Sequence, residues 1–161
     1  MMCELAKDDE IHKLKAALIA NPELVNERDH HGLTALHWAA HLNKPQYVTL
    51  LLQHGAEQTA TSRDGGTPMM EAVGYGRLRV LKLLYEHSSG GPGIARMKNY
   101  DGYTASSLAR EAYLPAAIYL EQKEEKAMIV SSLIDRELRF PIELGDLIKE
   151  YYGTKCFVED W

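Results

Sequence analysis

Two histidines offer the clearest candidate chemistry in this sequence. The segment HWAAH places His37 and His41 four residues apart, so both would lie on one face of a helix. This is the spacing of a zinc-binding histidine pair. However, no glutamate follows His37 to act as a general base, and no motif supplies a third ligand. The sequence therefore predicts no metal site here.

The motifs for nucleotide binding and covalent catalysis are also incomplete. The run Gly90-Gly91-Pro92-Gly93 lacks the Gly-Lys-Ser/Thr that ends a phosphate-binding loop. Gly74-Tyr75-Gly76 is not a dinucleotide fingerprint, and no Gly-x-Ser-x-Gly occurs. We therefore expect no catalytic residues, no cofactor and no enzymatic activity.

Composition and charge narrow the class of protein. The chain has 161 residues, 45% hydrophobic and 25% charged, which is typical of one globular domain with a short appendage. The net charge of −5 argues against a dedicated nucleic-acid binder, because neutralising phosphates needs a basic surface. No apolar run approaches the ~20 residues of a membrane span. We expect neither a nucleic-acid nor a membrane partner.

The cysteines and the N-terminus indicate the compartment. Cys3 and Cys156 lie near opposite ends in no metal or redox spacing, and two free thiols fit a reducing environment. The first residues, MMCELAKDDEIHK, have no apolar core of a secretory signal. We expect a monomeric cytoplasmic protein, with the nucleus as the alternative location.

A repeated helical pattern would position the residues considered so far. GLTALHWAA at 32–40 recurs as GGTPMMEAV at 65–73 and, more weakly, as GYTASSLAR at 102–110. Thr34 and Thr67 are 33 residues apart, whereas Thr67 and Thr104 are 37 apart. Each threonine is suited to cap the first turn of a helix. We assign the extra residues to a flexible loop at 88–93 (SSGGPG).

A second helix is expected at a fixed distance after each of these segments. Its apolar positions follow the i, i+3, i+4 spacing of one helix face. Gly55 is suited to a left-handed C-cap that ends one such helix. The matching apolar sets are Leu14, Ala17 and Leu18; Tyr47, Leu50 and Leu51; and Val80, Leu83 and Leu84.

A helix pair and a turn every 33 residues resembles the ankyrin repeat. The resemblance is carried by Asp29-x-x-Gly32-x-Thr34-Ala35-Leu36-His37-x-Ala39-Ala40 and by Val48-x-x-Leu51-Leu52-x-x-Gly55-Ala56. It implies an all-α ankyrin-repeat solenoid of about four repeats, with paired antiparallel helices, hairpin-like turns and a helical C-terminal extension. The implied array spans 1–125, with a partial repeat at 8–28 and repeats at 29–61, 62–98 and 99–124. The extension spans 126–161.

The resemblance also implies a concave face of turn tips and first helices that binds a protein partner. The variable positions on this face are rich in aromatic and Arg residues, which are the types common at interface hot spots. Trp38 is the strongest candidate anchor, unless Leu42 or a neighbouring helix covers it. The tyrosines of the turns could instead pack on the adjacent turn, and the histidines could be solvated. The candidate residues are His30, His31, Leu33, Trp38, Arg63, Asp64, Glu71, Tyr75, Tyr100 and Tyr103.

The C-terminal forty residues depart from the repeat. The sequence predicts an amphipathic helix from Lys126 to Leu138 and a second helix from Pro141 to Tyr152. The second segment resembles the opening of an F-box, which docks on the linker protein of cullin-type ubiquitin ligases. The other interpretation is a helical cap on the array. The candidate linker-binding residues are Phe140, Pro141, Glu143, Leu144 and Ile148.

These patterns lead to one main functional hypothesis and one alternative. The main hypothesis is a non-enzymatic protein–protein interaction module that binds its partner through the concave ankyrin face. The alternative is a substrate adaptor of a cullin-type ubiquitin ligase, of the viral or bacterial effector kind. In that case the array would hold the substrate and residues 140–152 would hold the ligase.

Overall fold

The computed structural model describes residues 2–8, 10–87, 91–112 and 114–137. Over these ranges the chain is helical and has no strand, which confirms the predicted all-α class. The helices are α1 (Met2–Lys7), α2 (Ile11–Ala20), the short 3-10 helix η1 (Pro22–Asn26), α3 (Ala35–His41), α4 (Pro45–Gln53), α5 (Pro68–Gly74), α6 (Leu78–His87), α7 (Gly91–Ala95), α8 (Ala105–Ala112) and α9 (Leu114–Glu137).

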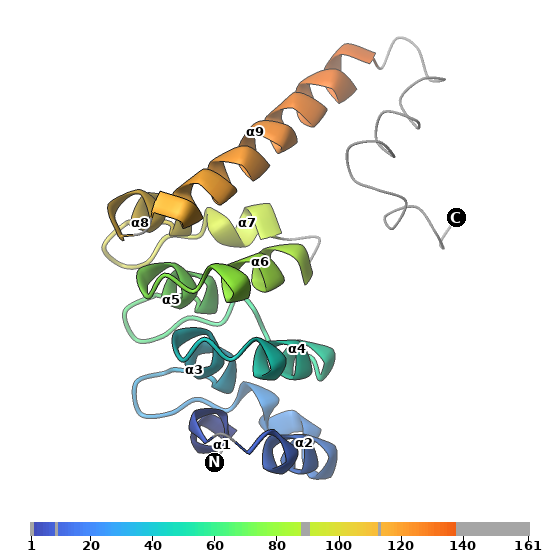
Figure 1. Cartoon of the computed structure of the whole chain (residues 1–161), viewed down its shortest axis with the longest axis vertical. Helices are drawn as coiled ribbons and strands as arrows, with labels where there is room; N and C mark the ends of the chain where they lie inside the picture. Colours follow the sequence, from blue (N-terminus) through green and yellow to red (C-terminus); the bar gives the residue numbers. More distant parts are fainter. Residues whose placement is uncertain (1, 9, 88–90, 113, 138–161) are drawn as a thin grey trace. The chain divides into compact units, whose positions relative to one another are not determined.

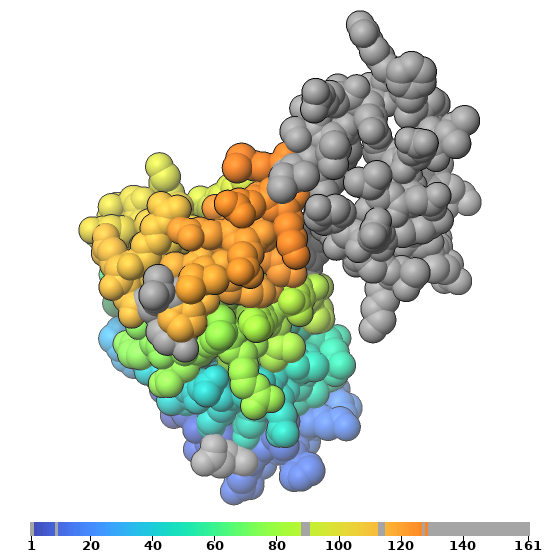
Figure 2. All heavy atoms as spheres, turned by 45° about the horizontal axis from the view of Figure 1, so that its top comes forward, coloured from blue at the N-terminus to red at the C-terminus, as the bar shows by residue number. Residues whose placement is uncertain are grey.

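The helices stack as pairs in chain order (Figure 1). The inner helices α1, α3, α5 and α8 pack one against the next, and α2, α4 and α6 are their outer partners. Figure 2 shows the first three pairs as adjoining bands, from blue to green. Each pair therefore contacts mainly its neighbours, as in other repeat architectures.

Apolar residues of the predicted spacing form the seam between the pairs. Leu18 and Leu51 are fully buried and Leu84 is 1% exposed, one residue from each of three successive outer helices. The buried residues of the inner helices include an alanine at the same position of each repeat, Ala39, Ala72 and Ala109, all at 0% exposure. Small side chains let the inner helices approach closely while the leucines fill the space between the layers.

The repeated threonines begin equivalent helices, as the sequence predicts. The hydroxyl of Thr67 accepts the Met70 N–H at 3.3 Å, which caps α5. Thr104 and Ser107 form a reciprocal capping box at the start of α8. At the start of α3 the same reciprocal box joins Thr34 to His37. The three helices therefore start in the same way in successive repeats.

His37 joins one repeat to the next. Its Nδ1 accepts the Thr34 N–H at 3.1 Å, so its Nε2–H donates to the Gly66 carbonyl, also at 3.1 Å. The ring is 1% exposed, and burial lowers the pKa of His37 from 6.5 to about 4. His37 is thus a neutral structural residue, with both ring nitrogens used inside the fold.

The N-terminal and C-terminal parts of the array differ from the sequence prediction. The partial first repeat at 8–28 omits α1, yet α1 packs on α3 as the inner helix of the first pair. At the other end, the predicted helix from Lys126 lies within α9, which runs without a break from the region assigned to the fourth repeat. The contacts divide the chain into two units, Met1–Glu121 and Gln122–Trp161.

The expected loop at 88–93 is wrong for its second half. Gly91 to Gly93 belong to the short helix α7, anchored by the buried Ile94 and Ala95. A Cβ atom on Gly91 would lie 2.2 Å from the Tyr85 carbonyl oxygen, so only glycine allows this approach. Pro92 is compatible with a first helical turn, which needs no N–H from it. Residues 88–90 lie outside the described residues.

The burial of His37 predicts a pH-dependent stability. Because the unfolded state takes up a proton near pH 6.5 and the folded state only near pH 4, stability is full above pH 6.5 and falls as the pH drops toward 4. The contribution is on the order of 3 kcal/mol. Urea unfolding from pH 7.5 to 4 should show this loss. The His37→Asn variant should be less stable at pH 7.5, and its free energy of unfolding should fall less steeply with decreasing pH. An equally steep fall in both proteins would contradict the assignment of this pH dependence to His37.

Candidate functional site

Three turns of similar construction, here called the fingers, precede α3, α5 and α8. Each begins with a short polar side chain that accepts the backbone N–H four residues later: Asp29 from Leu33 at 3.0 Å, Ser62 from Gly66 at 3.1 Å and Asn99 from Tyr103 at 2.8 Å. The glycine inside each turn has a positive φ, between 75° and 85°. These bonds give the fingers a defined shape.

The fingers are joined edge to edge by backbone hydrogen bonds. The Arg63 N–H donates to the His31 carbonyl at 3.0 Å, and the Tyr100 N–H donates to the Asp64 carbonyl at 3.1 Å. The same two turn positions are used in both links. The fingertip residues predicted from the sequence are therefore held in register from one repeat to the next.

A row of three rings joins the inner helix α3 to the end of the next inner helix, α5. The ring centroids of Trp38 and His41 are 5.7 Å apart, and those of His41 and Tyr75 are 4.0 Å apart. The Nδ1 atom of His41 also lies 3.4 Å from a carboxylate oxygen of Glu71. This ring row, Trp38–His41–Tyr75, thus brings together residues from α3 and from the end of α5.

Trp38 is less open than the sequence suggests. It is half-buried, and the Lys7 ammonium from α1 lies 4.1 Å from the centroid of its ring. Its indole N–H donates to Oδ2 of Asp29 at 2.8 Å. The expected large apolar face in water is therefore partly covered, by Lys7 of the neighbouring helix α1. The covering contacts also hold the ring in one orientation.

The charges around Trp38 are compensated within the fold. Burial alone would raise the pKa of Asp29, but hydrogen bonds from the Trp38 indole and from the N–H groups of His31 and Leu33 lower it overall. Lys7 pairs with Glu4 at 2.7 Å. Asp29 is consequently a carboxylate at neutral pH and a strong acceptor for the indole.

The predicted residues fall into two groups in the structure. Trp38, Glu71 and Tyr75 meet through His41 on the inner helices. The other group occupies the fingers, where Tyr100 is 79% exposed and Tyr103 is 40% exposed. Its remaining members are His30, His31, Arg63 and Asp64, which are exposed, and Leu33, which is half-buried.

Three residues of this surface are missing from the sequence prediction. The sequence pattern indicates His41 only as a candidate metal ligand, although its position three residues after Trp38 places both on one helix face. Asp29 has a second role as the acceptor for the indole, which its place in the repeat pattern does not reveal. Lys7 comes from α1, a helix outside the predicted repeats, and no local signal links it to Trp38.

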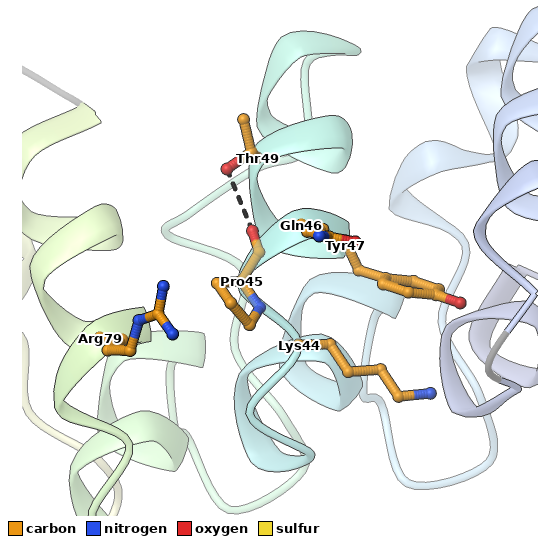
Figure 3. A pocket seen from close by; sticks show the side chains of 6 residues that line it. All are labelled: Lys44, Pro45, Gln46, Tyr47, Thr49 and Arg79. Atoms are coloured by element: carbon orange, nitrogen blue, oxygen red, sulfur yellow. Dashed lines mark hydrogen bonds between the residues drawn. The ribbon is translucent and has the colours of Figure 1, made fainter.

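A hollow of about 380 Å³ lies at the start of α4 and is lined by no residue of the ring row (Figure 3). The Lys44 side chain points away from Arg79 and toward the first helix pair. Its ammonium donates to the carbonyls of Ala6, Lys7 and Asp8 at 3.2, 2.6 and 2.7 Å. The charge of Lys44 is therefore used to hold the end of α1.

Metal, membrane and C-terminal features add no second site in the part of the chain that is described. There, no group of three or more His, Cys, Asp or Glu side chains is arranged to hold a metal ion. No helix within the same ranges combines the length and apolar character needed to cross a membrane. The F-box-like residues Phe140 to Ile148 lie outside the described residues.

The stacked helix pairs and fingers correspond to a known family. A family model described as "Ankyrin repeats (3 copies)" matches residues 3–94, more than half of the chain. The chain belongs to the ankyrin-repeat family. Ankyrin repeats generally mediate protein–protein interactions and generally act as non-enzymatic modules. The F-box resemblance lies outside the matched residues and stays a prediction.

Several curated proteins share this ankyrin region. The chain is 37% identical over 87 residues to human BCL-6 corepressor-like protein 1, covering 54% of this chain and 5% of that protein. It is 39% identical over 54 residues to Xenopus laevis Inversin-B, covering 34% of this chain and 5% of that protein. It is 34% identical over 82 residues to the human NAD-capped RNA hydrolase NUDT12, covering 51% of this chain and 18% of that protein. The chain thus spans a small part of the length of these relatives.

The role of Lys44 can be tested by replacing its charge and keeping its stem. Lys44→Met removes the donor to three carbonyls at the C-terminal end of α1 and just after it, and we expect the free energy of unfolding to fall by about 1–3 kcal/mol. Amide hydrogen exchange in α1 should become faster than in α4. Lys13→Met, on the exposed surface of α2, should change stability by less than about 0.5 kcal/mol. Equal effects of the two substitutions would contradict this role.

Proposed function

We propose that this ankyrin array is a docking surface for a protein partner, and that the ring row and the fingers form the contact. The observation that carries the proposal is the row itself. Trp38, His41 and Tyr75 come from two repeats, and the buried repeat positions do not account for them. Aromatic residues clustered in this way are typical of interface hot spots.

The exposure of Tyr75 supports a role in contact rather than in packing. Tyr75 remains 52% exposed although the centroid of its ring lies 4.0 Å from that of the His41 ring. Tyrosine presents a large apolar ring and a polar hydroxyl, which suits a surface that is wet in the free protein and covered in the complex. The neighbouring Glu71 adds a carboxylate to the same patch.

The rigidity of the surface supports the same function. The fingers are cross-linked by the bonds between Arg63 and His31 and between Tyr100 and Asp64. The ring row is attached to two buried inner helices. A surface that is already ordered loses little conformational entropy when a partner docks, so more of the contact energy appears as affinity.

The finer parts of this proposal extend beyond the family assignment. We place the partner contact on His30, His31, Leu33, Trp38, Arg63, Asp64, Glu71, Tyr75, Tyr100 and Tyr103, with His41 added. The array acts without catalysis or a cofactor, as a cytoplasmic or nuclear monomer. No observation on the described residues favours the ligase-adaptor alternative, which depends on residues 140–152.

The proposal predicts that Tyr75→Ala weakens partner binding without unfolding the array. The full chain is immobilised, proteins captured from a native lysate are identified, and the best-enriched protein is purified and titrated. We expect Tyr75→Ala to reduce its affinity by about 1–3 kcal/mol. Because Tyr75 is half exposed, stability should change by less than about 0.5 kcal/mol.

A matched control separates a specific surface from general hydrophobicity. Ile19 is 65% exposed on the outer helix α2, so Ile19→Ala removes a comparable exposed apolar side chain away from the ring row. Its affinity should equal that of the unmodified chain. If Tyr75→Ala binds as tightly as Ile19→Ala, the proposed surface is wrong. Trp38→Ala should also lose affinity, but it additionally removes the contacts with Asp29 and Lys7.

A further inference from the structure

One carboxylate connects the first finger to the ring row. Oδ1 of Asp29 accepts the backbone N–H groups of His31 at 2.9 Å and Leu33 at 3.0 Å. Its other oxygen, Oδ2, accepts the Trp38 indole N–H at 2.8 Å. The two oxygens therefore have separate tasks: one shapes the turn and the other holds a side chain on the inner helix α3.

The other two fingers show that the turn does not require a carboxylate. In the second finger the Ser62 hydroxyl accepts the equivalent backbone N–H, and in the third finger the amide oxygen of Asn99 accepts it. The residues at the position equivalent to Trp38 in these repeats are Glu71 and Leu108. Neither has a side-chain N–H, so a second acceptor oxygen at Ser62 or Asn99 would have no equivalent donor to bind.

A finger residue with a second acceptor oxygen, Oδ2 of Asp29, occurs in the repeat that carries a tryptophan, Trp38. Trp38 is held at two points, by Asp29 at the edge of its indole and by Lys7 over its ring. A half-buried ring with both contacts is restricted to one rotamer. The Trp38 ring then has the same orientation before and after a partner docks.

We propose that Asp29 is a positioning residue for the Trp38 anchor, acting through its Oδ2 atom and not through the turn. This inference rests on the proposed docking function. Asp29 need not touch the partner. It couples the first finger to the orientation of Trp38, so that the fingertip His31 and the ring row are presented as one unit.

The substitution Asp29→Asn separates the two tasks of the residue. The amide oxygen can keep the turn, as Asn99 does. The amide NH₂ would then replace Oδ2 and face the indole N–H, which sets one donor against another. The variant should fold with a melting temperature close to that of the unmodified chain but lose the hydrogen bond that orients the Trp38 indole.

The first readout needs no partner. Trp38 and Trp161 are the only tryptophans, so a chain labelled with ¹⁵N gives two indole N–H signals, and Trp161→Phe assigns them. We expect Asp29→Asn to shift the Trp38 signal and to accelerate its hydrogen exchange roughly tenfold or more, the factor expected on losing a bond to a charged group. Unchanged exchange would overturn the positioning role by itself.

The second readout is affinity for the purified protein whose capture depends on Tyr75. We expect Asp29→Asn to weaken it about tenfold, and to have no further effect in a Trp38→Phe background, where no indole N–H remains. An unchanged affinity, or the same loss in both backgrounds, would overturn the inference. Failure of the proposed function looks different: capture would be insensitive to Tyr75, whatever the indole exchange shows.

Discussion

A single helix pair of this chain cannot bury its own apolar residues, and the contact between successive pairs supports every other feature. The leucines of the outer helices, Leu18, Leu51 and Leu84, are covered only because another pair lies beside each of them. Burying a leucine stabilises a fold by about 1.5–3 kcal/mol. The stacking also sets the spacing at which the His37 ring reaches the Gly66 carbonyl and the fingers meet edge to edge.

The surface follows from this stacking by two further kinds of contact. Backbone bonds between fingers keep the turn tips in register, and the packing of α3 against α5 brings Trp38 and His41 of α3 together with Tyr75 at the end of α5. Polar contacts then limit how far these rings can move. A partner would therefore meet an ordered surface, which is the physical basis for docking without a large loss of entropy.

The predictability of each element depends on how local its cause is. Thr34, Thr67 and Thr104 were recognisable because a cap and the helix after it lie within a few residues. The helix at Gly91–Gly93 was not recognisable, since it depends on a close approach to Tyr85. The continuous helix α9 was also missed, because a polar run suggests a boundary although its residues are good helix formers.

The sequence by itself determined the repeat, the caps and the buried seam, because each is written in a short-range pattern of residue types, and it named candidate surface residues without their contacts. Only the tertiary structure decided which of those residues touch. The cover of Lys7 on Trp38 and the link from His41 to Glu71 each join residues about 30 positions apart, on neighbouring repeats. Such contacts arise when one repeat packs on the next, and no local pattern encodes which side chains then come within reach.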